Sequence, residues 1–512
     1  MQANISAGLL ALTVTAVMTH AVAGEAPADA PAIMGVQKAE DPSGVLGVVS
    51  LTGPTRNAGP FFQSLGTNGR SCSTCHVAEQ AFSFSAAGAR ERFAASGGRD
   101  PLFAPVDGAN CPNLPQHERA AHSLLLHDGL IRVGIKVPAK MEFSIRVVHD
   151  PYGCALIPDP AGGPPTVSVY RRPLPSANLV FLSGVMFDGR ETLAPLASES
   201  DFFANLVADL THQAMDATLG HAQAAQSPTD RQLSEIVDFE MGLYSAQLRD
   251  DGAGNLAARG ARGGPFHLAD QPYYPGVNDS LGADPDGKPF DSSAMTLFAR
   301  WLQPQRDDSG DEDSDDEMRD GRADSGHRDA ARRAVAAGEE LFNSAPMSIA
   351  NVRGLNDNAA LGKPASFTGH CTSCHDTPNV GNHSLPLPLD IGTAHSVRAG
   401  MESDPAIAAA LAQLSTPDLP VYRIDGCPNP FGAEEPESFY TTDPGRALVT
   451  GACSDFNRIK GPVLRGLAAR APYFHNGAAA DLRAVVNFYN ERFGMRLTDE
   501  QKSDLVAFLK SL

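Results

Sequence analysis

Two short motifs, at residues 72–76 and 371–375, carry the chemistry that this chain could perform, and both have the spacing Cys-x-x-Cys-His. Thiols at that spacing can add across the vinyl groups of a haem, and the histidine that follows then lies beneath the ring as an iron ligand. A zinc site would need further ligands at regular spacing, and a thioredoxin-like redox pair would need a βαβ context. The motifs therefore predict two covalently bound haem c groups with His76 and His375 as iron ligands. The attached cysteines are Cys72, Cys75, Cys371 and Cys374.

The N-terminus has the pattern of an export signal. An apolar run from Gly8 to Met18 precedes Ala21-Val-Ala23, a small-x-small cleavage pattern. The run is shorter than the ~20 apolar residues that cross a bilayer. We therefore expect cleavage after about Ala23, a periplasmic protein, and no membrane insertion of the mature chain.

Four of the eight cysteines lie outside the haem motifs. In an oxidising compartment they are expected to form disulfides, although buried free thiols are the alternative. Proximity in the chain favours the pairs Cys111–Cys154 and Cys427–Cys453.

Composition limits the class of partner. The chain has 512 residues, 42% of them hydrophobic, and a formal net charge of −20. The length predicts more than one domain, and the acidic balance argues against nucleic acid and anionic membranes as partners. A basic or neutral protein would fit better.

The elements that position the motifs are expected to be mainly α-helical. A helix is predicted at 227–247 and further helices near the C-terminus, the last opened by a capping box at Thr498. Alternating residues near 143–148 and 166–170 predict a small β insertion at about 130–172. The acidic run at 307–317 predicts a linker, 301–330, rather than a calcium site. We therefore expect two cytochrome-c-type haem domains, at 24–300 and 331–512, with the β insertion in the first.

Several segments resemble the bacterial di-haem cytochrome c peroxidase/MauG family, in a larger, MauG-like subgroup. They are Met186–Arg190, Leu210–Gln213, and Gly461–Gly477 followed by Leu482–Asn490. With both haem motifs in the family's order, the resemblance covers most of residues 60–512. It implies that the haem ligated by His76 reacts with peroxide and that the haem ligated by His375 relays electrons.

The resemblance also implies a second ligand for the relay haem. The family uses a methionine in its peroxidases and a tyrosine in its MauG-like members, and the matching position here is Tyr489. Met495 is the competing candidate and would give an ordinary His/Met haem. His475 matches a family residue that lies near the haem without ligating it.

The resemblance is weakest over the peroxide-reactive haem. The family places a glutamine there and a glutamate ten residues later, and the matching positions here are Gln213 and Gln223. A glutamine can orient peroxide but cannot accept its proton. His221 is the candidate proton acceptor, whereas the nearby His212 is more simply a surface histidine.

Three further expectations follow from the family pattern. Phe187 stands where the family has a tryptophan between the haems, so stepwise radical transfer through this position is not expected. Arg190 is expected to pair with a haem propionate. The context of His122 and His127 predicts an amphipathic helix rather than a gating loop, so the reactive haem should be open without prior reduction.

Members of this family often bind calcium between their two domains. Asn178 is a candidate match to its ligating asparagine, although the segment before it does not align cleanly. The loop 278–287 also offers oxygen donors, although such loops are more often plain turns.

The function implied is reduction of hydrogen peroxide with electrons from a small cytochrome c or cupredoxin, with the oxidising equivalents in a high-valent state shared by both haems. One alternative is MauG-like oxidation of a protein partner, which Tyr489 favours. The other is a non-catalytic di-haem electron-transfer protein, which the missing glutamate favours.

Overall fold

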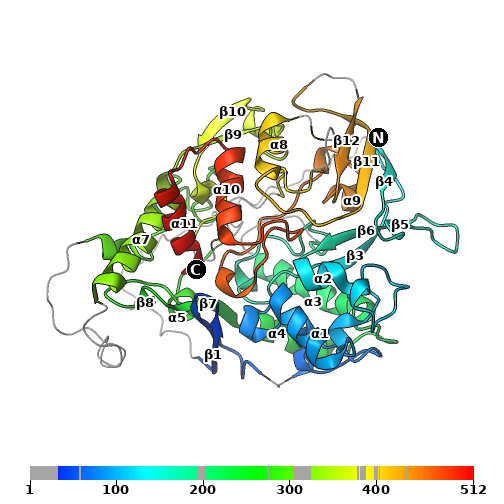
Figure 1. The fold of residues 1–512 in the computed structure, drawn as a ribbon, viewed down its shortest axis with the longest axis horizontal. Coiled ribbons are helices and arrows are strands. Elements are labelled where there is room, and N and C mark those ends of the chain that lie inside the picture. Colours follow the sequence, from blue (N-terminus) through cyan, green and yellow to red (C-terminus); the bar gives the residue numbers. More distant parts are fainter. Residues whose placement is uncertain are drawn as a thin grey trace, which may run out of the picture.

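The structure is a computed structural model that describes residues 33–56, 59–193, 202–274, 276–282, 284–303, 325–377, 380, 388–396, 402, 404–432 and 436–512. The predicted export signal and the acidic run at 307–317 lie outside these residues. Figure 1 shows the N-terminal half, blue to green, beside the C-terminal half, yellow to red, with short sheets between and around the helices. Within the described residues, no helix combines the length and apolar character needed to cross a membrane.

Helices form much of the N-terminal half: α1 (Ala86–Ser96), α2 (Ser123–Asp128), α3 (Phe202–Gly220), α4 (Asp230–Met241) and the short α5 (Pro265–Ala269). A capping box between Thr229 and Gln232 begins α4. The helix predicted at 227–247 is wrong in its last residues, because α4 ends at Met241 and a strand begins two residues later.

That strand, β7 (Leu243–Asp250), belongs to a sheet whose order is β1-β2-β7-β8. Its partners are β1 (Gly35–Asp41), β2 (Gly44–Ser50) and β8 (Gly254–Asn255). The first five residues of β7 are all buried, including the polar Ser245 and Gln247. Burial therefore does not follow the alternation of polar and apolar residues along this strand. Leu512 is hydrogen-bonded to this sheet, because the amide of Gln247 donates to the carbonyl of Leu512 at 3.2 Å.

The predicted β insertion is present, but it is not confined to the N-terminal half. Strands β3 (Ile131–Lys136), β6 (Thr166–Arg171) and β5 (Leu156–Ile157) form one sheet in that order. The remaining strand, β4 (Ser144–His149), pairs instead with β11 (Val421–Pro428), which pairs with β12 (Pro436–Thr441). Figure 1 shows cyan β4 beside orange β11. The insertion therefore joins the two halves through main-chain hydrogen bonds.

Both predicted cysteine pairs lie within disulfide distance. The Cα atoms of Cys111 and Cys154 are 6.0 Å apart, and those of Cys427 and Cys453 are 5.4 Å apart. The first pair links the segment before α2 to the β insertion. The second links the end of β11 to the segment after α9 (Ala447–Thr450).

The C-terminal half is built around three helices: α7 (Ser325–Ser344), α10 (Leu482–Arg492) and α11 (Asp499–Lys510). It also holds α8 (Pro405–Leu411) and the hairpin of β9 (Met347–Ala350) with β10 (Ser366–Gly369). The capping box predicted at Thr498 is confirmed at the start of α11. Helix α7 begins inside the predicted 301–330 linker, and its Val335 and Phe342 pack in one core with Leu505 and Phe508 of α11.

A buried ion cluster also joins the two halves. The guanidinium of Arg171 donates to Asp188 at 2.6 Å and to both oxygens of Asp443, at 2.6 and 2.9 Å. None of the three side chains is more than 3% exposed. Burial by itself would raise the pKa of Asp188, but the charges of Arg171 and Arg190 outweigh it and lower that pKa to about 2. All three groups are therefore charged at neutral pH.

Candidate active site

Each Cys-x-x-Cys-His motif folds as a tight turn at the wall of a cavity. The turns are 3-10 helices at Cys72–Thr74 and Cys371–Ser373. The amide of each motif histidine donates to the carbonyl of the first cysteine, at 3.0 Å for His76 and 2.9 Å for His375. All four motif cysteines are free thiols that line these cavities.

Each motif borders an extended empty space. This space, with open solvent at its mouth included, is about 1350 Å³ at the first cavity and 1670 Å³ at the second. Arg172 and Phe187 line both cavities, so they belong to the wall between them. The first cavity includes the predicted residues Cys72, Cys75, His76, Phe187, Arg190, Gln213 and His221. The second includes Cys371, Cys374, His375, His475, Tyr489 and Met495.

His76 has the environment of a metal ligand. Its Nδ1 lies 2.9 Å from the carbonyl oxygen of Phe82 and therefore carries the proton that this contact needs. The other ring nitrogen, Nε2, is then free of a proton and able to bind a metal. Burial lowers the pKa of His76, with a smaller contribution from His221, so the ring is neutral. A second interaction that fixes ring and tautomer in this way is typical of histidine ligands.

Buried cations in the cavity walls fit the acidic edge of a haem. The guanidinium of Arg172 donates to the carbonyls of Gly129, Phe84 and Arg470 rather than to a carboxylate. Burial lowers the pKa of Arg172 to about 9, of Arg470 to about 10 and of Lys460 to about 8. Buried charge of one sign is costly unless it is neutralised. The propionate carboxylates of a haem would neutralise these groups, so the donor set and the walls fit haem c.

Three hydrogen-bonded side chains, a histidine, an aspartate and an arginine, lie at the wall of the first cavity. His221 follows the end of α3, and its Nδ1 hydrogen-bonds the carboxylate of Asp107, which also pairs with Arg70. Arg70 in turn donates to the carbonyls of Leu102 and Ala104, at 2.8 and 3.2 Å. Burial alone would raise the pKa of Asp107, but Arg70 and His221 outweigh it and lower that pKa.

These hydrogen bonds determine which ring nitrogen of His221 carries a proton. Because Asp107 is an ionised acceptor, Nδ1 is the protonated nitrogen of His221 and Nε2 is the one that can accept a further proton. Proximity in sequence pointed to His221, but not to Asp107 or Arg70. Asp107 is 114 residues from His221 in a Pro- and Gly-rich loop, so no periodicity connects the two.

The two predicted glutamines have different environments. Gln213, on α3, lines the first cavity. Gln223 is exposed, its Oε1 accepts a hydrogen bond from the amide of Asn68 at 3.3 Å, and it does not line the cavity. The chain turns sharply after α3 ends at Gly220, and Gln223 has a left-handed backbone with φ 53°. That turn directs Gln223 to the surface and leaves His221 at the cavity.

The other predicted histidines lie away from the first cavity wall. His212 is partly exposed, and its Nδ1 donates to Glu191 at 2.7 Å. His122 is buried, with its ring nitrogens 2.7 and 2.8 Å from the carbonyl oxygens of Gly108 and Gln116. His127 lies in the short helix α2, on its exposed side. The segment 121–128 is thus helical, as its pattern predicted.

The second cavity contains both candidates for the relay-haem ligand. Tyr489 lies on α10 and Met495 just after it, and both pack with the motif cysteines in one cluster. Burial raises the pKa of Tyr489, and so does the proximity of Cys374 and Cys371. His475 also lines this cavity, and its ring centroid is 6.1 Å from that of Phe187. Burial lowers the pKa of His475 to about 4, so it is neutral.

The oxygens considered for calcium already accept hydrogen bonds within the chain. The amide oxygen of Asn178 accepts from the amide of Ser245 at 3.0 Å. In the loop 278–287, Asp284 accepts from the amides of Asn278 and Asp286, at 3.0 and 2.8 Å. The Asn178 bond joins that residue to β7, and the Asp284 bonds lie within one turn. Calcium at either place stays a prediction.

Comparison with known proteins gives partial matches. No family model matches the chain. Cytochrome-c peroxidase IdrP2 of Denitromonas iodatirespirans is 31% identical over 160 residues, 28% of this chain and 37% of that protein. The cytochrome c551 peroxidase of Nitrosomonas europaea is 35% identical over 92 residues, 18% of this chain and 26% of that protein. The cytochrome c551 peroxidase of Pseudomonas aeruginosa is 37% identical over 87 residues, 16% and 25% respectively.

These matches span well under two thirds of the relatives' own lengths. The relatives are oxidoreductases by name. Over the matched stretches, this chain is similar to the cytochrome-c peroxidases.

Proposed function

We propose that this protein is a di-haem c-type peroxidase that reduces hydrogen peroxide to water with electrons from a small redox protein. The observation that carries the proposal is the His221–Asp107 pair at the wall of the cavity that also contains His76. Such a pair supplies a positioned proton acceptor, which an electron carrier does not need. The similarity to cytochrome-c peroxidases gives independent support.

At the first cavity, Cys72, Cys75 and His76 would hold the haem, and the haem would supply the iron chemistry that reduces peroxide. His221 accepts the proton that peroxide loses, through Nε2, and returns it to the departing oxygen. Asp107 stabilises the charged imidazolium formed meanwhile, while Arg70 keeps Asp107 ionised. Gln213 can hold an oxygen through its amide hydrogens.

The second cavity would receive the electrons. Cys371, Cys374 and His375 would hold its haem, and Phe187 in the shared wall lies between the two sites. Because phenylalanine is hard to oxidise, electrons would tunnel past Phe187 rather than hop through it. The net charge of −20 suits a basic donor protein of the cytochrome c or cupredoxin type.

The remaining features of the proposal concern setting and subgroup. The proposal includes export to the periplasm and two haem domains of cytochrome-c type. It also includes the disulfides Cys111–Cys154 and Cys427–Cys453.

Tyr489 in the second cavity favours a second candidate, MauG-like oxidation of a protein partner. A tyrosinate ligand would stabilise the higher oxidation states that such a reaction requires.

The test is to mix the air-oxidised, haem-loaded protein with one equivalent of hydrogen peroxide and to record visible and near-infrared spectra on the millisecond scale. A fast change in the haem bands is expected, because no gating histidine is predicted at the first cavity. An accompanying near-infrared band would indicate oxidation shared by the two haems. A protein that fails to react in both the oxidised and the half-reduced state would contradict the peroxidase proposal and leave an electron carrier.

A pair of variants tests the ligand of the second haem. Tyr489→Phe is expected to raise the reduction potential of that haem by on the order of 0.1 V, since axial ligands tune haem potentials over ~0.8 V. Met495→Leu should leave the potential and the visible spectrum nearly unchanged. Spectroelectrochemical titration of both variants measures the effect. The reverse result would make Met495 the ligand and an ordinary peroxidase the better assignment.

A further inference from the structure

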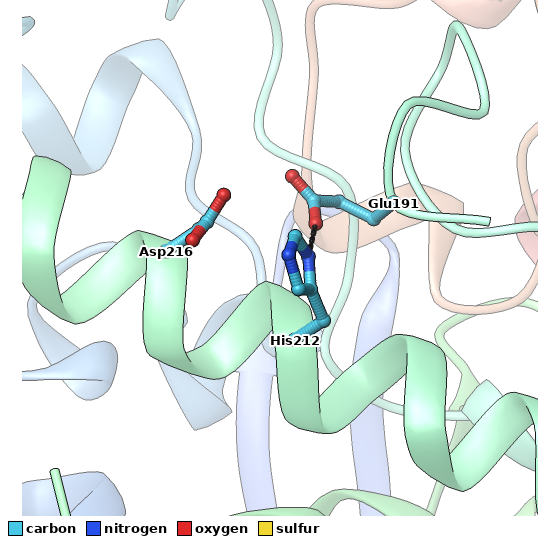
Figure 2. A group of neighbouring side chains, drawn as sticks. All are labelled: Glu191, His212 and Asp216. Carbon is cyan, nitrogen blue, oxygen red and sulfur yellow. Dashed lines mark hydrogen bonds and ion pairs between the residues drawn. The ribbon is translucent and has the colours of Figure 1, made fainter. Parts of the chain in front are cut away.

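A cluster of three metal-binding side chains lies outside both cavities. It contains Glu191, His212 and Asp216, and one ligand atom from each lies within 4.8 Å of the others. His212 and Asp216 are four residues apart on α3, so they project from the same face of the helix. Figure 2 shows Glu191 reaching this face from the neighbouring segment, with its carboxylate over the His212 ring and Asp216 on the next turn of the helix.

The cluster has an excess of negative charge. The Glu191 side chain is only 7% exposed, and its Oε2 accepts the hydrogen bond from His212. Its Oε1 is 3.8 Å from Arg190 Nε, too far for a hydrogen bond, and Arg190 also pairs with Asp188. Asp209, on the same helix, is a further carboxylate that is 4% exposed. A cation held here would offset a buried like-charge repulsion that Arg190 is poorly placed to relieve.

The donor types select the class of cation. An imidazole nitrogen with two carboxylates suits zinc or manganese(II), whereas calcium prefers a shell of 6–8 oxygens. Asp216 is exposed and His212 is partly exposed, so an ion can enter from solvent and water can complete its coordination. We propose that Glu191, His212 and Asp216 bind a divalent transition-metal ion of this kind.

An ion at this position would affect how the segment that contains Arg190 is held against α3. Glu191 directly follows Arg190, which lines the first cavity. The Glu191–His212 hydrogen bond joins this segment to α3, and so does the bond from the amide of Leu193 to Asp209 at 2.8 Å. A bound ion would replace the Glu191–His212 bond with coordination from both sides. It would thereby fix the cavity wall at Arg190 against α3. The inference does not depend on the peroxidase proposal.

The test measures Zn²⁺ and, separately, Mn²⁺ binding to the haem-loaded protein by isothermal titration calorimetry. Asp216→Asn removes an exposed ligand but leaves the Glu191–His212 hydrogen bond intact, and His212→Ala removes the nitrogen ligand. Each is expected to weaken one Zn²⁺-binding event about 10–100-fold, the range for loss of even an outer partner of a metal ligand. Asp238→Asn, an exposed carboxylate on α4, is the matched control and should bind as the wild type does.

X-ray absorption at the zinc edge supplies a readout that does not depend on activity. The wild-type protein with one equivalent of Zn²⁺ should give a nitrogen/oxygen shell with histidine scattering, and His212→Ala should lose that histidine signal. Equal affinity in the wild type and both variants would overturn the proposal, as would no binding at all. Displacement of the zinc by equimolar Ca²⁺ would overturn it too, since an oxygen-only site would then be responsible.

Discussion

Replacing His221 with alanine is expected to slow peroxide turnover about 10²–10⁴-fold, the usual contribution of a positioned proton-transfer group. The proton of peroxide would have no acceptor at the cavity wall, because Gln213 cannot take it. The measurement is steady-state oxidation of a reduced cytochrome c by peroxide, with haem content checked by its visible spectrum. His117→Ala, which changes an exposed histidine before α2, is the matched control and should keep wild-type turnover.

The partner of His221 provides a second readout. Asp107→Asn keeps a hydrogen-bond acceptor for Nδ1 but removes the charge that stabilises the imidazolium, so the rate should fall less than in His221→Ala. Full turnover in His221→Ala would show that the proton goes elsewhere. The peroxidase proposal would then lose its main support.

Replacing Arg171 with methionine is expected to destabilise the protein by about 3–5 kcal/mol, the range for breaking a buried ion pair. The change leaves Asp188 and Asp443 buried without the cation that now joins them. Urea unfolding followed by circular dichroism measures the loss. Arg146→Met is the control: Arg146 pairs with Asp425 at the surface, with its own side chain 65% exposed, and its loss should change the unfolding midpoint little.

The same variant has a pH signature. The pKa of Asp188 is lowered to about 2, below the ~3.9 of an unfolded aspartate. A lowered carboxyl pKa contributes stability that is present above the unfolded pKa and is lost as pH falls toward the folded pKa. The difference between wild type and Arg171→Met should therefore be largest at neutral pH and should shrink between about pH 4 and 2. A difference that stays constant down to pH 2 would mean that the loss is one of packing rather than charge.

The sequence alone determined the features that depend on a few neighbouring residues. The Cys-x-x-Cys-His spacing predicts its own turn and chemistry within five positions, and both motifs indeed line cavities. Thr498 predicted the start of α11, because a capping box needs only the first turn of its helix. Gln213, His221 and Tyr489 are predicted from the family resemblance or from nearness in sequence. The first two line the first cavity and Tyr489 lines the second, while their chemical roles stay predictions.

Only the tertiary structure decided what depends on contacts between distant segments. Asp107 and Arg70 reach His221 across more than 100 residues, and β4 pairs with a strand of the other half rather than with its own sheet. Gln223 turns outward because of a backbone conformation that no local pattern predicted. These outcomes follow from packing and from hydrogen bonds between segments far apart in the chain, whose free energies do not depend on the spacing of neighbouring residues.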